Sequence, residues 1–254
     1  MKGTFVITCK YSKEHSLLMN CLRSIREHHP DHEIFVVDSN SNDKSYFKTA
    51  SEQYGAIIED ANNRNFTTGA VWHMYNNHKR DYYYFLHDST EVLGNFDHLT
   101  ENDVVPILLS NENFPWPVWP VKKKNDPVWN ENNRSYAWAQ DNINKHTSFE
   151  FRKSGFRCVG GPKFLCNRSV LERLKSAGFH KLLPTTKQES EMMERLWGFA
   201  FDELGYTPLM KEVVMLAGRN QPAPRIWTEV DNMQVRKNHY VNGDLIVKYW
   251  PGRK

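Results

Sequence analysis

Apolar residues in the first third of the chain occur in two alternating patterns. Short continuous runs rich in β-branched and aromatic residues predict strands at residues 4–9, 33–37, 56–58 and 82–86, the first of them a buried parallel strand. Helical spacing of apolar residues predicts the intervening helices, at residues 14–28, 44–54 and 67–79. This alternation predicts an α/β fold with a mixed, mainly parallel sheet flanked by helices.

The second part of the chain is less regular. Residues 158–166 predict a further strand, and residues 169–177 and 190–204 predict helices. Residues 111–150 are rich in Asn, Pro and Trp and show little periodicity, so we expect irregular structure there, either a functional loop or a disordered stretch. We expect the polar tail after residue 219 to pack across the first half.

Composition narrows the class of protein. The chain has 254 residues, of which 39% are hydrophobic and 25% charged, which favours one globular domain over a disordered chain. The net charge of +3 is spread along the sequence, so no basic patch indicates nucleic acid, whereas a small phosphate-bearing ligand is compatible. No apolar segment has the length of a signal peptide core or a membrane span, and we expect a soluble, cytoplasmic protein.

The four cysteines lack the spacing of a zinc site. Cys9, Cys21, Cys158 and Cys166 form no CxxC pair, and no histidine pair lies at zinc-finger distance from them. We therefore expect free thiols in a reducing compartment.

Two acidic residues directly follow predicted strands. Asp38 ends the second strand and Asp88 follows the fourth, and ligands of parallel sheets bind beyond such carboxyl ends. Asp38 is interpreted as a ligand of a base or ribose, or as a helix cap. Asp88, with His87 beside it, either holds Mn2+ or Mg2+ against a diphosphate or only turns the chain.

A third group of acids lies at the start of the helix predicted at 190–204. Glu189, Glu191 and Glu194 are candidates for a general base, because a carboxylate near an acceptor hydroxyl can take its proton. The alternative is a structural role, since acids at a helix N-terminus interact favourably with the helix dipole.

Residues 4–95 resemble the nucleotide-binding half of GT-A glycosyltransferases, especially the inverting family-two type. The segment Val36-Val37-Asp38-Ser39-Asn40-Ser41-Asn42-Asp43 is similar to the family pattern Val-Val-Asp-x-x-Ser-x-Asp. Asn62-Asn63-Arg64-Asn65 and Gly69-Ala70 resemble the family's Asn-rich turn and Gly-led helix. The family's Asp-x-Asp metal motif is reduced to one acid in Leu86-His87-Asp88-Ser89-Thr90.

Residues 155–206 resemble the acceptor half of the family more loosely. Gly160-Gly161 is similar to its Gly-containing strand, and the Glu189–Glu194 group followed by Gly205-Tyr206 is similar to its catalytic helix and Gly-Tyr pair. The chain as a whole resembles small, compact transferases of large DNA viruses and bacteria, and a viral origin would imply the host cytoplasm.

The resemblance implies a GT-A (Rossmann-like) fold in a single domain, 1–254, with a nucleotide-sugar-binding half (1–95) and an acceptor half (96–254). It implies transfer, with inversion, from a nucleoside-diphosphate sugar (a UDP-sugar by default) to a hydroxyl of a glycan or glycoconjugate. The implied donor-binding residues are Thr8, Asp38, Asn65, Gly69, His87 and Asp88. Asp88 and His87 would hold Mn2+ or Mg2+, and Glu189, Glu191 or Glu194 would be the base.

Two other functions stay open. The chain is alternatively a non-catalytic binder of carbohydrate or nucleotide sugar, for which the missing second Asp is the best argument. It is alternatively a sugar nucleotidyltransferase, although residues 9–14 lack the Gly-rich loop of that class. The aromatic residues at 114–138 either stack on sugar rings or fill the space between the two halves.

Overall fold

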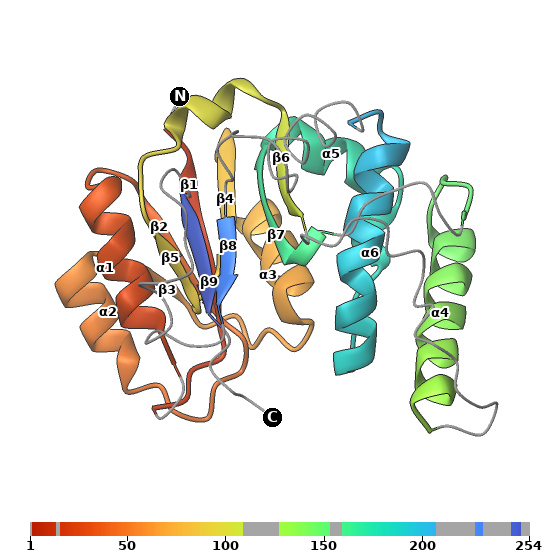
Figure 1. Cartoon of the computed structure of the whole chain (residues 1–254), viewed down its shortest axis with the longest axis horizontal. Helices are drawn as coiled ribbons and strands as arrows, with labels where there is room; N and C mark the ends of the chain where they lie inside the picture. The colour runs from red at the N-terminus through yellow and green to blue at the C-terminus, as the bar shows by residue number, and fades with distance from the viewer. Residues whose placement is uncertain are drawn as a thin grey trace.

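A computed structural model describes residues 2–13, 16–108, 127–152, 159–206, 227–230 and 245–249, with side chains described in α4 only from residue 136 onward. A six-stranded sheet in the order β3-β2-β1-β4-β7-β6 forms its centre (Figure 1). The first four strands in this order are parallel, and β7 runs antiparallel to both of its neighbours. The strands are β1 (Thr4–Cys9), β2 (Ile34–Asp38), β3 (Ile57–Glu59), β4 (Tyr82–His87), β6 (Val104–Leu108) and β7 (Val159–Asn167).

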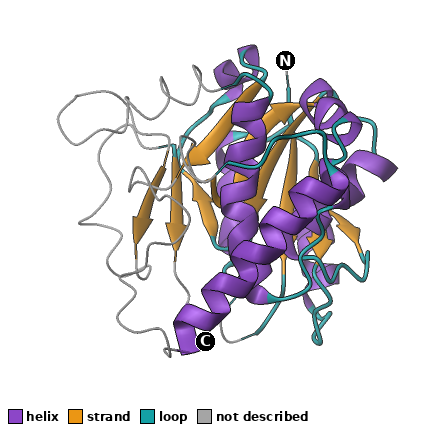
Figure 2. Ribbon diagram, turned by 90° about the vertical axis from the view of Figure 1, so that its right-hand side faces the viewer, coloured by secondary structure: helices purple, strands orange, loops and turns teal. Residues whose placement is uncertain are grey.

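Helices cover both faces of this sheet (Figure 2). One face packs against α1 (Leu18–His28) and α2 (Tyr46–Tyr54), and the other packs against α3 (Phe66–Asn77) and α5 (Arg168–Ser176). Two further helices, α6 (Lys187–Glu203) and α4 (Pro127–His146), extend the second layer outward (Figure 1). The mixed, mainly parallel α/β fold predicted from the sequence is confirmed.

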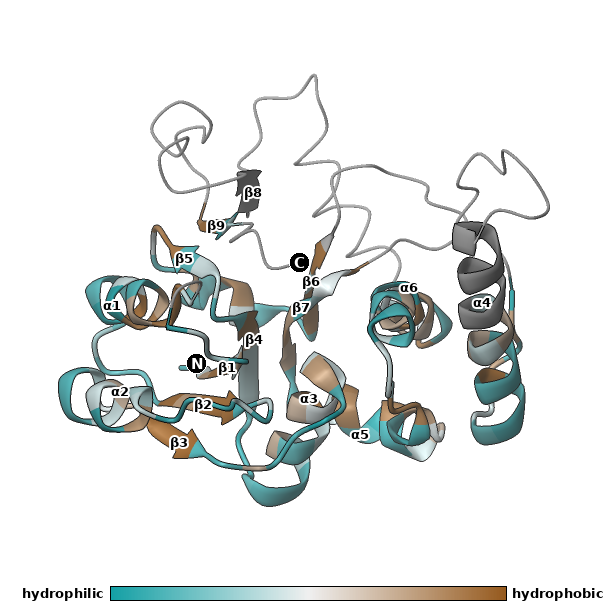
Figure 3. Ribbon diagram, turned by 90° about the horizontal axis from the view of Figure 1, so that it is seen from below, coloured by the Kyte–Doolittle hydropathy of each residue, from teal (hydrophilic) through white to brown (hydrophobic). Residues whose placement is uncertain are grey.

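Alternate residues of the buried strands contribute to two separate cores. On β1, Val6 belongs to the α3 side, whereas Phe5 and Ile7 belong to the α1 side. Because both faces are covered, the strands need apolar residues at every position, which is why they appear as continuous runs. Figure 3 shows β2 and β3 as strongly hydrophobic ribbons.

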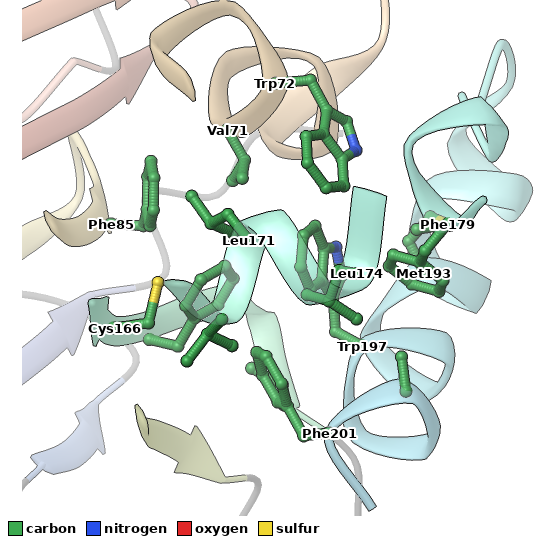
Figure 4. Packing of buried hydrophobic residues seen from close by; sticks show 14 of the residues in the cluster. Val71, Trp72, Phe85, Cys166, Leu171, Leu174, Phe179, Met193, Trp197 and Phe201 are labelled. Atoms are coloured by element: carbon green, nitrogen blue, oxygen red, sulfur yellow. The ribbon is translucent and has the colours of Figure 1, made fainter. Parts of the chain in front are cut away.

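Trp197 of α6 is the largest fully buried side chain of the core on the α3 side. It is fully buried and stacks on Trp72 of α3 with ring centroids 5.9 Å apart (Figure 4). Its ring centroid also lies 4.8 Å from that of Phe164. Its indole nitrogen donates to Thr68 Oγ1 over 3.2 Å, so its polar group is satisfied within the core. This contact joins α6 to α3 and fixes α6 relative to the carboxyl end of the sheet.

A second, three-stranded sheet brings the end of the chain back to the first half, as expected for the tail. Its order is β5-β9-β8, with β5 (Thr90–Val92) antiparallel to β9 (Ile246–Tyr249) and β8 (Trp227–Val230) parallel to β9. A 3-10 turn (Asp97–Glu101) connects β5 to β6, and a second one (Phe179–Lys181) follows α5.

The elements predicted from periodicity before residue 95 are all present, with ends shifted by a few residues. Gly55 caps α2 with a φ of 59°, as predicted for a helix C-terminus. The helix predicted at 190–204 begins earlier, at Lys187, because Thr186 and Glu189 form a capping box.

The expectation of irregular structure over 111–150 was wrong for residues 127–146, which form α4. Pro127 is suited to the first helical position, and the buried Ala139 and Ile143 face α6 at i, i+4 spacing. Tyr136 and Trp138 pack partly buried against the core, in line with the packing role for these two aromatic residues. The remaining aromatic residues of this stretch, from Phe114 to Trp129, lie outside the described side chains.

None of the helices in the described ranges combines the length and the apolar character that a membrane crossing requires. Cys9, Cys21 and Cys166 are buried free thiols, as expected, and Cys158 lies outside the described residues.

Gly178 is required where the end of α5 meets the end of α4. Its φ is 86°, and a Cβ there would lie 1.9 Å from the His146 carbonyl oxygen. We expect Gly178→Ala to lower the free energy of unfolding by more than the ~1–2 kcal/mol of a left-handed alanine, because the backbone must also move.

Gly205→Ala is the matched control for this substitution. Gly205 has nearly the same φ, 84°, but a Cβ there meets nothing within 4 Å. Denaturant unfolding should therefore show a smaller loss for Gly205→Ala, and equal losses would contradict the clash at position 178.

Candidate functional site

A cavity of about 350 Å³ lies beyond the carboxyl ends of β1, β2 and β4. The chain builds outward from β1 to β2 and β3 and then crosses back to place β4 on the other side of β1. Ligands of open α/β sheets bind where the strand order reverses in this way. The lining residues are Thr8, Lys10, Ser39, Asn40, Asn63, Arg64, Phe66, Thr67, His87, Asp88 and Thr185.

Thr8, one of the lining residues, has a buried side-chain hydroxyl. The residue is 9% exposed, and among the described residues none forms a hydrogen bond with Thr8 Oγ1. A buried hydroxyl without a partner costs free energy unless a ligand or water satisfies it. Lys10 and Arg64 line the same cavity and supply positive charge. The cavity is therefore suited to an anionic ligand that accepts or donates a hydrogen bond at Thr8.

Asp38 is fully buried, and its carboxylate is turned into the protein instead of lining the cavity. One oxygen accepts the Ser41 N–H over 2.9 Å, and the other accepts the Tyr46 hydroxyl over 2.7 Å. These bonds hold the loop after β2, in which Asn40 adopts a φ of 59°. The structure thus brings Ser39 and Asn40 to the cavity and leaves Asp38 as the residue that shapes their loop.

Asn63 organises the connection between β3 and α3. Its side-chain amide donates to Ser39 Oγ over 3.1 Å and to the Phe66 carbonyl over 2.7 Å. Gly69 packs against it so closely that a Cβ at position 69 would lie 2.0 Å from Asn63 Oδ1. Asn65 points the other way and donates to the Pro184 carbonyl over 3.0 Å. Neither Gly69 nor Asn65 lines the cavity, but both hold residues that do.

His87 and Asp88 both reach the cavity, from different sides of the sheet. His87 Nε2 lies 2.8 Å from Thr67 Oγ1 of α3, whereas the Asp88 carboxylate accepts the Cys9 thiol over 3.6 Å. Asp88 N–H also donates to the Thr8 carbonyl over 3.1 Å, which joins the ends of β4 and β1. A carboxylate at this point fits Mn2+ or Mg2+, which need only one or two protein carboxylates beside phosphate oxygens. His87 is directed to Thr67 by its hydrogen bond.

The C-terminal strand contacts the chain immediately after Asp88. The buried ammonium of Lys248 in β9 contacts Ser89 Oγ, and the Tyr249 hydroxyl donates to the Glu91 carboxylate. Thr90, which pairs with Lys248 in the register of β5 and β9, occupies the place of the second acid in an Asp-x-Asp pattern that begins at Asp88. A lysine therefore approaches the position where a second carboxylate is missing. Sequence patterns alone did not single out Lys248, because its neighbours depend on the pairing of β9 with β5.

The three acids of α6 have different surroundings. Glu189 accepts bonds from the backbone of Thr185 and Thr186 in the capping box. Glu191 has a side chain that is 58% exposed, 3.9 Å from Lys187 Nζ. Glu194 is half-buried and faces Gly161 and Lys163 of β7. Only Glu194, of these three, is directed toward the sheet.

Burial raises the pKa of Glu194 from 4.5 to about 7. The ammonium of Lys163, the nearby Arg195 and a hydrogen bond from the Gly161 backbone act in the opposite direction, and Glu191 adds to the rise. A carboxyl that titrates near neutral pH is suited to general base catalysis.

Gly161 connects Glu194 to the cavity. With a φ of 55°, it has no room for a side chain, because a Cβ would lie 2.8 Å from His87 Cε1 and 3.3 Å from Lys163 Nζ. His87 lines the cavity, so Gly161 places Glu194 and Lys163 near the side of the cavity that His87 forms. Sequence reasoning identified Gly161 and Glu194 but missed Lys163, which carries no motif signal.

Comparison with known proteins adds little at the level of sequence. No family model matches the chain, and no curated protein matches it. Among solved structures, the crystal structure of residues 1–349 of S. aureus TarS overlaps with a TM-score of 0.41 at 12% identity, covering 75% of this chain and 53% of that one.

Two further TarS structures give similar values. Crystal structures titled as full TarS and as TarS 1–349 in complex with UDP each overlap with a TM-score of 0.43, at 11% and 12% identity. They cover 89% of this chain, and 41% and 68% of the respective TarS chains. This chain spans about half the length of the first of these TarS structures. Overlap at this level is too limited for a functional argument, which rests on the cavity instead.

The raised pKa of Glu194 has a consequence for stability. Between pH 4.5 and about 7 the unfolded chain releases this proton while the folded chain retains it, so native stability falls as the pH rises through that interval. We expect Glu194→Gln to gain stability relative to the wild type over this interval, by on the order of 2 kcal/mol, with no further change above it.

Denaturant unfolding of both proteins at several pH values measures this difference. Glu191→Gln, on the exposed side of the same helix, should show no such pH-dependent gain. A constant difference between Glu194→Gln and the wild type from pH 4.5 to 8 would contradict the burial of an ionisable group at position 194.

Proposed function

We propose that this protein is a glycosyltransferase that uses a nucleoside-diphosphate sugar. The observation that carries the proposal is the cavity at the reversal of strand order, where Thr8, Lys10 and Arg64 meet Asp88. Cationic side chains match a diphosphate, and an acid among them matches a divalent cation bound to that diphosphate. The resemblance of residues 36–43 and 62–70 to the GT-A motifs supports the same function.

In this proposal the donor lies across the ends of β1 and β4. Thr8 Oγ1 binds an oxygen of the donor, and Lys10 and Arg64 neutralise its diphosphate. Asp38, Asn63 and Glu189 act as positioning residues, because each holds a loop that contributes to the cavity wall. A UDP-sugar is the default donor, taken from the family resemblance.

Mn2+ or Mg2+ is the proposed cofactor, with Asp88 as its protein ligand. Such an ion, when bound, neutralises the charge that develops on the departing nucleoside diphosphate. His87 is assigned a different role: bonded to Thr67 and adjacent to Gly161, it lines the donor cavity on the side where Glu194 lies.

Glu194 is the proposed general base. It would take the proton from an acceptor hydroxyl of a glycan or glycoconjugate while that oxygen attacks the anomeric carbon and the nucleoside diphosphate leaves from the opposite side. One such displacement inverts the configuration of the sugar. Glu189 is committed to the capping box and Glu191 is exposed, so Glu194 is favoured among the three acids.

Assays on the purified protein separate this function from its two alternatives. A transferase slowly releases nucleoside diphosphate from its sugar donor when Mn2+ is present. A non-catalytic binder binds the donor without releasing it. A nucleotidyltransferase instead releases pyrophosphate from a nucleoside triphosphate and a sugar phosphate.

Asp88→Asn tests the metal assignment. We expect Mn2+ to increase the affinity of the wild-type protein for a UDP-sugar, and we expect this increase to be lost in Asp88→Asn because the amide is a poor ligand for a hard cation. Isothermal titration calorimetry with and without Mn2+ measures it.

Asp81→Asn provides the control, because Asp81 is exposed and directly precedes β4, at the end of that strand opposite to Asp88. An undiminished Mn2+-dependent gain in Asp88→Asn would overturn the assignment of Asp88.

Glu194→Gln tests the base. We expect kcat to fall by roughly 10²–10⁴-fold while the donor Kd stays the same, because only proton transfer is removed. The wild-type kcat/KM should rise with pH through about 7, as Glu194 becomes ionised.

Glu191→Gln should keep normal turnover and serves as the control on the same helix. Normal turnover in Glu194→Gln would show that another group accepts the proton.

A further inference from the structure

A cluster of two histidines and one glutamate lies on the outer side of α3, away from the residues that line the donor cavity. The two Glu59 oxygens each contact an imidazole, with His73 Nε2 and His78 Nε2 both at 2.9 Å. These ligand atoms all lie within 4.8 Å of one another. We call these three residues the Glu59 cluster.

The chain brings these residues together from fixed backbone positions. Glu59 is the last residue of β3, paired beside Val37 of β2, and His73 lies in the last two turns of α3. Five residues after His73, a continuing helix would direct a side chain to a different face. His78 instead leaves the helix with extended backbone angles, φ −130° and ψ 111°, and its ring packs on Phe35 at 4.5 Å between centroids. The break in the helix therefore allows both imidazoles to face one carboxylate.

The donor set has the chemistry of a zinc site. Two imidazole nitrogens and a carboxylate are ligands that Zn2+ binds at about 2.0–2.2 Å, usually with water completing a tetrahedron. An ion between the present atoms would replace the two hydrogen bonds with three coordinate bonds after small movements of the side chains. The side chains are 21–23% exposed, so the cluster is open to solvent for the ion and its water.

Neighbouring groups hold the imidazoles in place. Asn77, one turn after His73, lies 3.3 Å from His73 Nδ1, and its amide also donates to the His73 carbonyl over 2.9 Å. The Asn77 amide thereby fixes the orientation of the His73 ring, and Zn2+ on Nε2 would place the ring proton on Nδ1 and require Asn77 to turn its carbonyl oxygen toward it. Phe35 performs the corresponding function for His78 through ring packing.

We propose that the Glu59 cluster binds a Zn2+ ion that braces the connection between β3 and α3. Residues 60–72 form the chain between the first two ligands, and they include four residues of the cavity wall: Asn63, Arg64, Phe66 and Thr67. A bond between the two ends of this segment restrains it. The nitrogen-rich set discriminates against Mg2+ and Mn2+, which prefer oxygen ligands, so this site is chemically distinct from Asp88.

The proposal is independent of the enzymatic function, and Zn2+ and Co2+ alone are sufficient probes. After treatment with chelator and removal of the chelator, the full chain is titrated with Zn2+ by calorimetry and its Tm is recorded. We expect one site, a raised Tm, and the visible absorption of four-coordinate Co2+ when Co2+ is the probe. Wild-type protein that binds no Zn2+, or binds Co2+ only with the weak spectrum of a six-coordinate ion, overturns the proposal.

Glu59→Gln and His73→Gln are the informative variants. Glutamine keeps hydrogen-bonding capacity, so the fold is preserved, but at position 59 it removes the anionic ligand and at position 73 it removes the imidazole. We expect each to weaken Zn2+ binding by at least about tenfold and to abolish the Zn2+-dependent rise in Tm. His98→Ala, which removes an exposed imidazole elsewhere, should leave both unchanged.

A second candidate cluster for Zn2+ must be distinguished from the Glu59 cluster. His29, His32 and Asp97 also lie within 4.8 Å of one another, but Asp97 Oδ1 already accepts the Tyr84 hydroxyl over 2.9 Å and lies 2.8 Å from His32 Nε2. If Zn2+ affinity is lost in His32→Gln and kept in Glu59→Gln, the ion belongs to that cluster and the proposal for Glu59 is wrong.

Discussion

The crossover of the chain between β1 and β4 creates the space on which every proposed contact depends. From β1 the chain builds outward through β2 and β3, and it returns through α3 to place β4 on the opposite side of β1. The connections after these two strands therefore diverge, and the Asp88 N–H bond to the Thr8 carbonyl keeps the two strand ends together below the gap. Thr8 lines that gap, and its buried Oγ1 has no partner among the described residues, which is a cost that only a bound molecule or water offsets.

Most of the acidic residues identified as candidates in the sequence do not line the cavity and affect it only through neighbouring residues. The Asp38 carboxylate accepts hydrogen bonds from Ser41 and Tyr46, and the Glu189 carboxylate accepts hydrogen bonds at the start of α6. Each carboxylate therefore fixes a loop whose neighbouring residues form the cavity wall. This division has a physical reason. A loop that must present polar groups to a ligand cannot also satisfy its own backbone, and a buried carboxylate supplies the missing acceptors. The proposed chemistry is then left to Asp88 and Glu194, which lie on different elements.

The sequence predicted the parallel half of the fold because strands covered on both faces require continuous apolar runs, as in Tyr82–Leu86. It did not predict α4, whose helical pattern is weak and whose position depends on Ala139 and Ile143 packing against α6. At the site, Asp88 was predictable because it directly follows a recognisable strand. Lys163 and Lys248 were not, because their places depend on β7 pairing with β4 and β9 pairing with β5, contacts between residues far apart in the chain.

The distribution of charge favours an order in which donor and metal bind together. A single carboxylate at Asp88 offers a divalent cation little attraction while Lys10 and Arg64 line the same cavity. A diphosphate reverses that balance, because its oxygens neutralise the two cations and supply further ligands for the metal. A site with two acids could retain Mn2+ by itself, whereas the proposed site at Asp88 would need the donor to complete the coordination. The reduction of the acidic motif to one residue is therefore compatible with metal-assisted transfer, provided that the diphosphate is itself the main ligand.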